Sequence, residues 1–196
     1  MRKVFLIAIL AVVLVFVAVP MYAFPIYLNV SNEDLGVSGN FASVDVTVAD
    51  NIATFTVDAN QAILIPDSTD SNFGIQRFGF NSNLDLSDAT FVLPSRWSAG
   101  WNSNISMFGI FYVDASGTGG NRQDPLVFTV QDSEITAASN FYVENADGYH
   151  YVAHIADFEE MGPNNKTSAY FSDGGTPVPE PMTLLLLGLG LVGLAG

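Results

Sequence analysis

The sequence lacks cysteine altogether and is poor in positive charge. Without cysteine the chain has no disulfide framework, no thiol catalysis and no thiolate metal site. The 196 residues include 6 lysines and arginines against 20 aspartates and glutamates, which gives a net charge of −14 at pH 7. Because like charges repel, we expect neither nucleic acid nor an anionic lipid surface as a partner.

The central part of the chain, residues 24–172, also lacks any amphipathic helical pattern of ten or more residues. It carries instead short runs of β-branched and aromatic residues, each of strand length and bounded by turn residues. Residues 49–51 predict a tight hairpin, and residues 114–124 predict a long glycine-rich loop. Local turns favour antiparallel pairing, so we expect an all-β protein, an antiparallel β-sandwich of jelly-roll or immunoglobulin-like type. The predicted strands are 43–48, 53–58, 73–80, 105–113, 126–130, 141–144 and 149–155.

The N-terminal segment has the pattern of a secretory signal peptide. Arg2 and Lys3 precede an uninterrupted apolar run over 4–19, and Ala23 supplies a small residue for cleavage. We therefore expect residues 1–23 to be removed on export, with an uncleaved membrane anchor as the alternative. Removal leaves 4 basic residues against 20 acidic ones, a net charge of −16.

A linker and a short apolar segment follow the central part. Residues 173–181 are rich in glycine and proline, and proline in a helix interior removes a donor and crowds the preceding turn. We therefore expect a hydrophobic helix to begin after Pro181 and to cover residues 182–196, which carry no charge. At ~1.5 Å per residue this helix is about 22 Å long, shorter than a hydrocarbon core of about 30 Å.

A Pro-Glu-Pro triplet followed by a leucine- and glycine-rich run resembles the PEP-CTERM sorting signal of Gram-negative bacteria. In that family the triplet is recognised by an exosortase, a membrane protease-like enzyme, so the resemblance implies this role for Pro179, Glu180 and Pro181. It also implies transient anchoring in the inner membrane and delivery to the cell surface. Family members end in a short arginine cluster, whereas this sequence reaches Gly196 without one. A glycolipid anchor signal, with small residues at 172–174, is the alternative address.

Two tryptophans offer the best candidate for ligand binding in the central part. Trp97 and Trp101 lie within residues 94–104, which proline and glycine predict to be a loop. Flat, apolar indoles suit stacking on sugar rings, so a carbohydrate-binding site is one interpretation. The alternative is that both rings close the end of the sandwich core.

Metal sites have weaker support in the sequence. His150 and His154, the only histidines, have a spacing that suits zinc on a helix, but their surroundings predict a strand. In a strand the two rings lie on one face about 13 Å apart, so we expect packed or exposed histidines instead. The acidic segments 67–72 and 83–88 lack the glycine and the closing glutamate of an EF-hand loop. We expect no cofactor, with calcium as the one candidate ion.

Together these patterns predict a non-catalytic exported protein of the cell surface or the exopolysaccharide matrix, with an exosortase-like enzyme as its processing partner. The alternative is a secreted carbohydrate-binding module that uses Trp97 and Trp101, with calcium ordering its loops. A third hypothesis, a secreted hydrolase, requires a carboxylate pair or a site centred on His150. Residues 36–40 do not supply a serine nucleophile elbow, because the final glycine is missing.

Overall fold

The computed structural model describes residues 25–69 and 72–174, and this part of the chain is all-β. It forms two antiparallel sheets, with 3-10 turns at Ser106–Phe108 (η1) and Ala138–Phe141 (η2). The predicted all-β fold with antiparallel sheets is therefore confirmed. The predicted signal peptide, the Pro-Glu-Pro motif and the C-terminal helix lie outside the described residues. Over the described ranges, no helix is long and apolar enough to cross a membrane.

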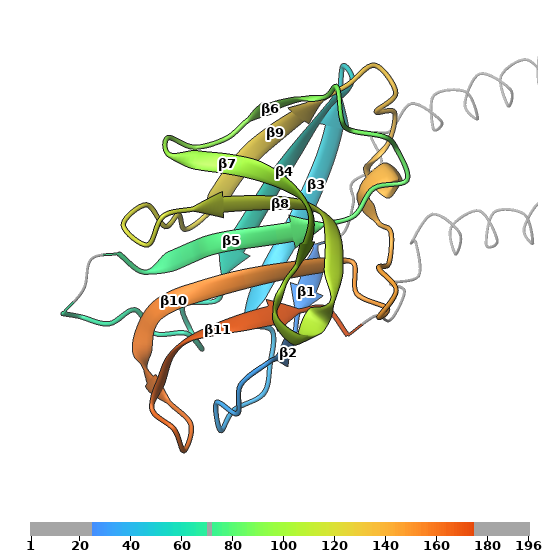
Figure 1. Cartoon of the computed structure of the whole chain (residues 1–196). Coiled ribbons are helices and arrows are strands. Elements are labelled where there is room, and N and C mark those ends of the chain that lie inside the picture. Colours follow the sequence, from blue (N-terminus) through green and yellow to red (C-terminus); the bar gives the residue numbers. More distant parts are fainter. Residues whose placement is uncertain (1–24, 70–71, 175–196) are drawn as a thin grey trace, which may run out of the picture.

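Figure 1 shows the two sheets as crossed layers, with a six-stranded sheet in front of a five-stranded one. The strands of the five-stranded sheet are, in spatial order, β1 (Ile26–Leu28), β3 (Ala42–Ala49), β4 (Ile52–Ala59), β9 (Leu126–Gln131) and β6 (Thr90–Val92). The strands of the six-stranded sheet are β2 (Val30–Ser31), β11 (Lys166–Ser172), β10 (Tyr151–Met161), β5 (Gly74–Phe80), β8 (Ile110–Gly117) and β7 (Trp97–Asn104).

The inward faces of both sheets are apolar, because side chains alternate between the two faces along each strand. On β4, Ala53, Phe55 and Val57 are buried, while the residues between them are partly exposed. Each fully buried aromatic ring of this kind stabilises the fold by about 2–3 kcal/mol, so the core replaces the disulfides that the chain lacks. Phe55 lies at the centre of the core, with its ring centroid 4.6 to 6.2 Å from those of Phe78, Phe80, Phe128 and Phe141.

The hairpin predicted around residues 49–51 is confirmed. Ala49 pairs with Ile52, so Asp50 and Asn51 alone form the turn between β3 and β4. Both turn residues have positive φ, 52° and 61°, as a type I′ turn requires. Aspartate and asparagine tolerate this left-handed conformation better than other residues with a side chain, which explains why this turn sets the register of the pair.

Other local predictions are wrong. Residues 141–144 are not a strand, since Phe141 ends η2 and irregular chain follows. The predicted strand 105–113 is interrupted by η1 and by Gly109, whose φ is 87°, so β8 begins only at Ile110. The predicted loop 94–104 is largely strand β7, and β8 continues four residues into the predicted loop 114–124. Pairing between β7 and β8 overrides the polar, glycine-containing composition of both segments.

The hairpin of β7 and β8 bends over the outward face of the six-stranded sheet. Figure 1 shows the hairpin crossing in front of β5 and β10, with its tip near the ends of β11 and β2. We call residues 102–111 the hairpin arm. Its Ile105, Phe108 and Phe111 are buried and form a second small core with Val152 of β10. Gly79 of β5 leaves room for this contact, because a Cβ there would lie 2.5 Å from Cδ1 of Ile105.

The two ends of the described chain lie side by side. The backbone N–H of Asn29 donates to the carbonyl of Ser172 at 2.9 Å, and β2 pairs with β11 through Ser31 and Phe171. The carboxylate of Asp173 then accepts the backbone N–H groups of His150 and Tyr151. The chain therefore enters and leaves the sandwich at the same edge.

Candidate functional site

Trp97 is a core residue, the position expected in the alternative in which both rings close the end of the sandwich core. It lies on β7 and is only 8% exposed. Its indole N–H donates to the carbonyl of Asn121 at 2.8 Å, and its ring covers Gly117, where a Cβ would lie 2.6 Å from Cε2. A ring held in this way on both its face and its polar edge has no free surface for a sugar.

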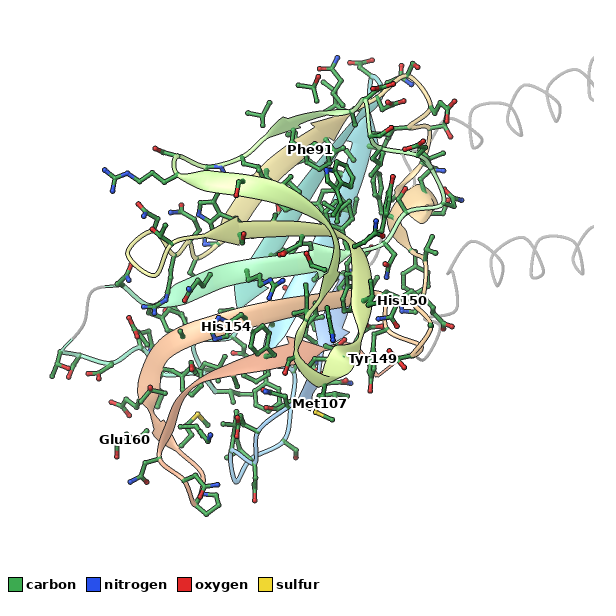
Figure 2. The ribbon with its side chains drawn as sticks, viewed as in Figure 1. Phe91, Met107, Tyr149, His150, His154 and Glu160 are labelled. Atoms are coloured by element: carbon green, nitrogen blue, oxygen red, sulfur yellow. The ribbon has the colours of Figure 1, made fainter. Side chains whose placement is uncertain are left out.

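Trp101 is the tryptophan that reaches the surface, with 41% of its area exposed. Its ring lies edge-on to Phe91, at a centroid distance of 5.7 Å, and 5.4 Å from the ring of Tyr112. Phe91 comes from β6 and Trp101 from β7, which are edge strands of the two sheets on the same side of the sandwich. Figure 2 shows Phe91 beside these edge strands. Trp101 thus combines both interpretations, since it closes the open side of the core and still offers an exposed ring.

His150 joins the end of the described chain to the segment before β10 and is buried, so it is not part of an open site. Its Nδ1 lies 2.6 Å from Oδ2 of Asp173, its ring stacks on Tyr142 at 3.8 Å, and its Nε2 lies 3.8 Å from Glu144. His150 is 3% exposed and Asp173 is 3% exposed. In the described ranges, no three histidine, aspartate or glutamate side chains are placed to hold a metal ion.

The acidic segments considered for calcium are engaged in local turns. Asp67 accepts hydrogen bonds from the backbone N–H and the hydroxyl of Thr69, and Asp85 accepts the N–H of Ser87 and the hydroxyl of Tyr112. These bonds favour the ionised carboxylates, so the pKa of each is lowered, chiefly by the backbone bond within its own turn. Calcium binding remains a prediction.

The outward face of the six-stranded sheet carries a row of polar side chains, one from each of five neighbouring strands. The register places Tyr170 beside His154, His154 beside Arg77, Arg77 beside Ser116, and Ser116 beside Ser98. We call these five residues the polar band. Four strand spacings of ~4.8 Å make the band about 19 Å long.

Arg77 and Asp114 form the charged centre of the band. The guanidinium donates twice to the carboxylate, from Nε at 2.8 Å and from Nη2 at 2.7 Å. Asp114 is largely buried and Arg77 partly so, with side-chain exposures of 10% and 25%. The hydrogen bonds to Asp114 raise the pKa of Arg77, and burial opposes them only in part. The pair is a planar, nearly neutral unit, and the side chain of Tyr170 also hydrogen-bonds to the guanidinium.

His154 is held neutral beside this pair. Its ring stacks on Tyr170 at a centroid distance of 4.3 Å and an interplanar angle of 17°. Burial, together with the positive charges of Arg122 and Arg77, lowers the pKa of His154 to about 4. At neutral pH the imidazole therefore presents one donor and one acceptor nitrogen. Figure 2 shows His154 on the outward face of β10.

Arg122 borders the band from the loop before β9. It forms an ion pair with Asp157, and its Nε donates to Oε1 of Gln76 at 3.3 Å. Arg77 and Arg122 are two of the four basic residues outside the predicted signal peptide, so positive charge is concentrated on this face. Sequence reasoning missed the band because its members are up to 93 positions apart, from 77 to 170, and form no local motif. Only the strand register brings them together.

Comparison with known proteins adds no relative. No protein-family description matches the chain, and neither a curated protein nor a solved structure matches it significantly.

Proposed function

We propose that the chain is an exported, non-catalytic protein of the cell surface or exopolysaccharide matrix, sorted through Pro179, Glu180 and Pro181 by an exosortase-like enzyme. The observation that carries this proposal is the order of segments in the sequence. An apolar leader, a disulfide-free β-rich body, a glycine- and proline-rich linker and a Pro-Glu-Pro triplet before an uncharged leucine-rich run follow one another. The adjacent ends of the body support it, because an anchor at either end would hold the same edge of the sandwich.

We also infer that the sandwich is of the immunoglobulin-like rather than the jelly-roll type. The strand order β3-β4-β9-β6 corresponds to the A-B-E-D sheet of an immunoglobulin-like domain, and β11-β10-β5 corresponds to its G-F-C sheet. The hairpin β7–β8 is then an insertion between the fourth and fifth strands that extends the second sheet beyond β5. Trp101 and the hairpin arm both belong to this insertion.

Mass spectrometry of both termini tests the sorting proposal, on protein recovered separately from membranes and medium of its native host. We expect a mature start near residue 24 and an end close to Pro179-Glu180-Pro181 in surface or released material. A Glu180→Ala variant should keep its C-terminal segment, while the matched Asp173→Asn variant, which leaves the triplet intact, should still be processed. Wild-type protein that retains residues 182–196 and stays in the membrane would contradict the proposal.

A carbohydrate-binding role for Trp101 is the second candidate, favoured by the 41% exposure of its ring beside Phe91. Matrix polysaccharide should quench the fluorescence of Trp101, since stacking changes the environment of an exposed indole. The quenching should disappear in Trp101→Phe and persist in Trp97→Phe, because Trp97 is buried. Fluorescence that no polysaccharide changes would remove this candidate.

A further inference from the structure

We propose that the polar band binds a neutral saccharide chain, laid across the strands of the six-stranded sheet. The proposal rests on the proposed matrix function and names a class of ligand for it. The polar band does not include Trp101, so this surface is distinct from the second candidate site. Its basis is the row of Tyr170, His154, Arg77, Ser116 and Ser98 in register on adjacent strands.

The first argument is unused hydrogen-bonding capacity. The hydroxyls of Ser98 and Ser116 and the ring nitrogens of His154 make no hydrogen bond to another residue within 25–69 and 72–174. Sugar hydroxyls donate and accept at once, so they pair well with serine hydroxyls and with a neutral imidazole. The rim of the Arg77–Asp114 pair adds charged donors and acceptors whose orientation the bidentate geometry already fixes.

The second argument is the shape of the surface. The hairpin arm covers one flank of the band through Ile105 and Phe111, and Arg122 with Asp157 borders the other. Gly100 of β7 lies beside Asp114 of β8 and has no side chain to cover the band. The space there is open, because a Cβ added at Gly100 would lie 3.7 Å or more from every neighbour. A strip about 19 Å long, with a stacked His154–Tyr170 pair at one end, fits a short oligosaccharide segment.

The third argument is charge, which selects among saccharides. The chain without its leader carries a net charge of −16, and both arginines at the band are already paired with aspartates. An anionic polymer such as a polyuronate would meet repulsion from the whole domain with no free cation to offset it. A neutral polymer meets no such penalty.

Isothermal titration calorimetry on the full-length protein in mild detergent tests the proposal. The ligands are neutral hexasaccharides of the cello, malto, manno and laminari series, with a hexauronate for comparison. We expect at least one neutral hexasaccharide to bind and the hexauronate to bind at least tenfold more weakly. The double variant Ser98→Ala, Ser116→Ala should raise the dissociation constant at least tenfold, and His154→Ala should do the same.

A matched control removes two hydroxyls from the other sheet. Thr54 and Thr129 are partners on the outward face of the five-stranded sheet, so Thr54→Ala, Thr129→Ala should change the dissociation constant less than twofold. Trp101→Ala should also leave it unchanged, which separates this surface from the second candidate. The proposal is overturned if no neutral hexasaccharide binds, if the hexauronate binds best, or if the serine and threonine double variants weaken binding equally. Since binding is measured on purified protein, a failure here is distinct from a failure of sorting in the host.

Discussion

The outward faces of the two sheets differ, although both inward faces are apolar. On the five-stranded sheet, Thr47, Thr54 and Thr129 are direct partners across three strands, and each is at least partly exposed. The charged residues of that face are the acids Asp45 and Asp58. The six-stranded sheet instead carries ion pairs, a histidine and the hairpin arm. Alternation along the strands places the apolar residues in the core, whereas the inserted hairpin and the ion pairs make one outer face different from the other.

The largest predicted effect comes from removing the anchor of the hairpin arm. Phe108→Ala should lower the free energy of unfolding by about 3–5 kcal/mol, because Phe108 is fully buried and its ring packs edge-on to Tyr149. Urea denaturation measures this change. The neighbouring Met107 is 65% exposed, so Met107→Ala should cost less than about 0.5 kcal/mol. Equal losses in both variants would mean that the arm is not packed on the sheet, and that its outward face is as open as that of the five-stranded sheet.

The second predicted effect is a pH dependence of the free energy of unfolding. It arises from His154, on the outward face of the six-stranded sheet. The pKa of His154 is about 4 in the fold against 6.5 in the unfolded chain, so the unfolded state takes up a proton first as pH falls. Stability from this group is complete above pH 6.5 and is lost between pH 6.5 and about 4, on the order of 3 kcal/mol at most. The ion pairs Arg77–Asp114 and Arg122–Asp157 supply the charged groups near the ring.

Urea denaturation at pH 7, 5.5 and 4 isolates the contribution of His154 when wild type is compared with His154→Gln. The variant should lose less stability than wild type between pH 7 and 4. Parallel pH dependence of the two proteins would contradict the neutral, buried state of this ring.

The smallest predicted effect concerns two glycines on the same sheet. Gly79→Ala should destabilise the protein by about 2 kcal/mol, since the new Cβ would lie 2.5 Å from Ile105 and 2.8 Å from Val152. Gly100→Ala should be neutral or slightly stabilising, because the nearest atom is 3.7 Å away. Melting temperatures of the two variants report the difference. If both were tolerated equally, the arm would not press on β5.

Strands with clear alternation were predictable from the sequence, and edge strands were not. Val44, Val46, Phe55 and Val57 alternate with polar residues, and the Asp50–Asn51 turn joins their strands, so local signals agree with the fold. β1, β2 and β6 are two or three residues long, too short for a periodicity to be read. β7 is polar along most of its length, and only its pairing with β8 makes it a strand.

The candidate site was predictable only in part. Trp101 was predicted to lie in a loop, whereas it is exposed on edge strand β7. Nothing local to Trp97 indicates that Gly117 and Asn121 enclose it. The Arg77–Asp114 pair joins residues 37 positions apart, and its geometry depends on the register of β5 against β8. Such contacts are set by tertiary pairing, which a single sequence does not specify.

The pairing of β2 with β11 also determines when the six-stranded sheet can form during synthesis or export of the chain. β2 lies near the start of the body and β11 ends it, yet the two are neighbours in one sheet, and β10 occupies the position between β11 and β5. A chain that emerges from a ribosome or an export channel with its N-terminus first therefore exposes unpaired strand edges until its last strand appears. Closing a loop of this length is a slow, entropically costly event. The six-stranded sheet can therefore be completed only after β11 has been synthesised, and no shorter N-terminal portion of the body contains all of its strands.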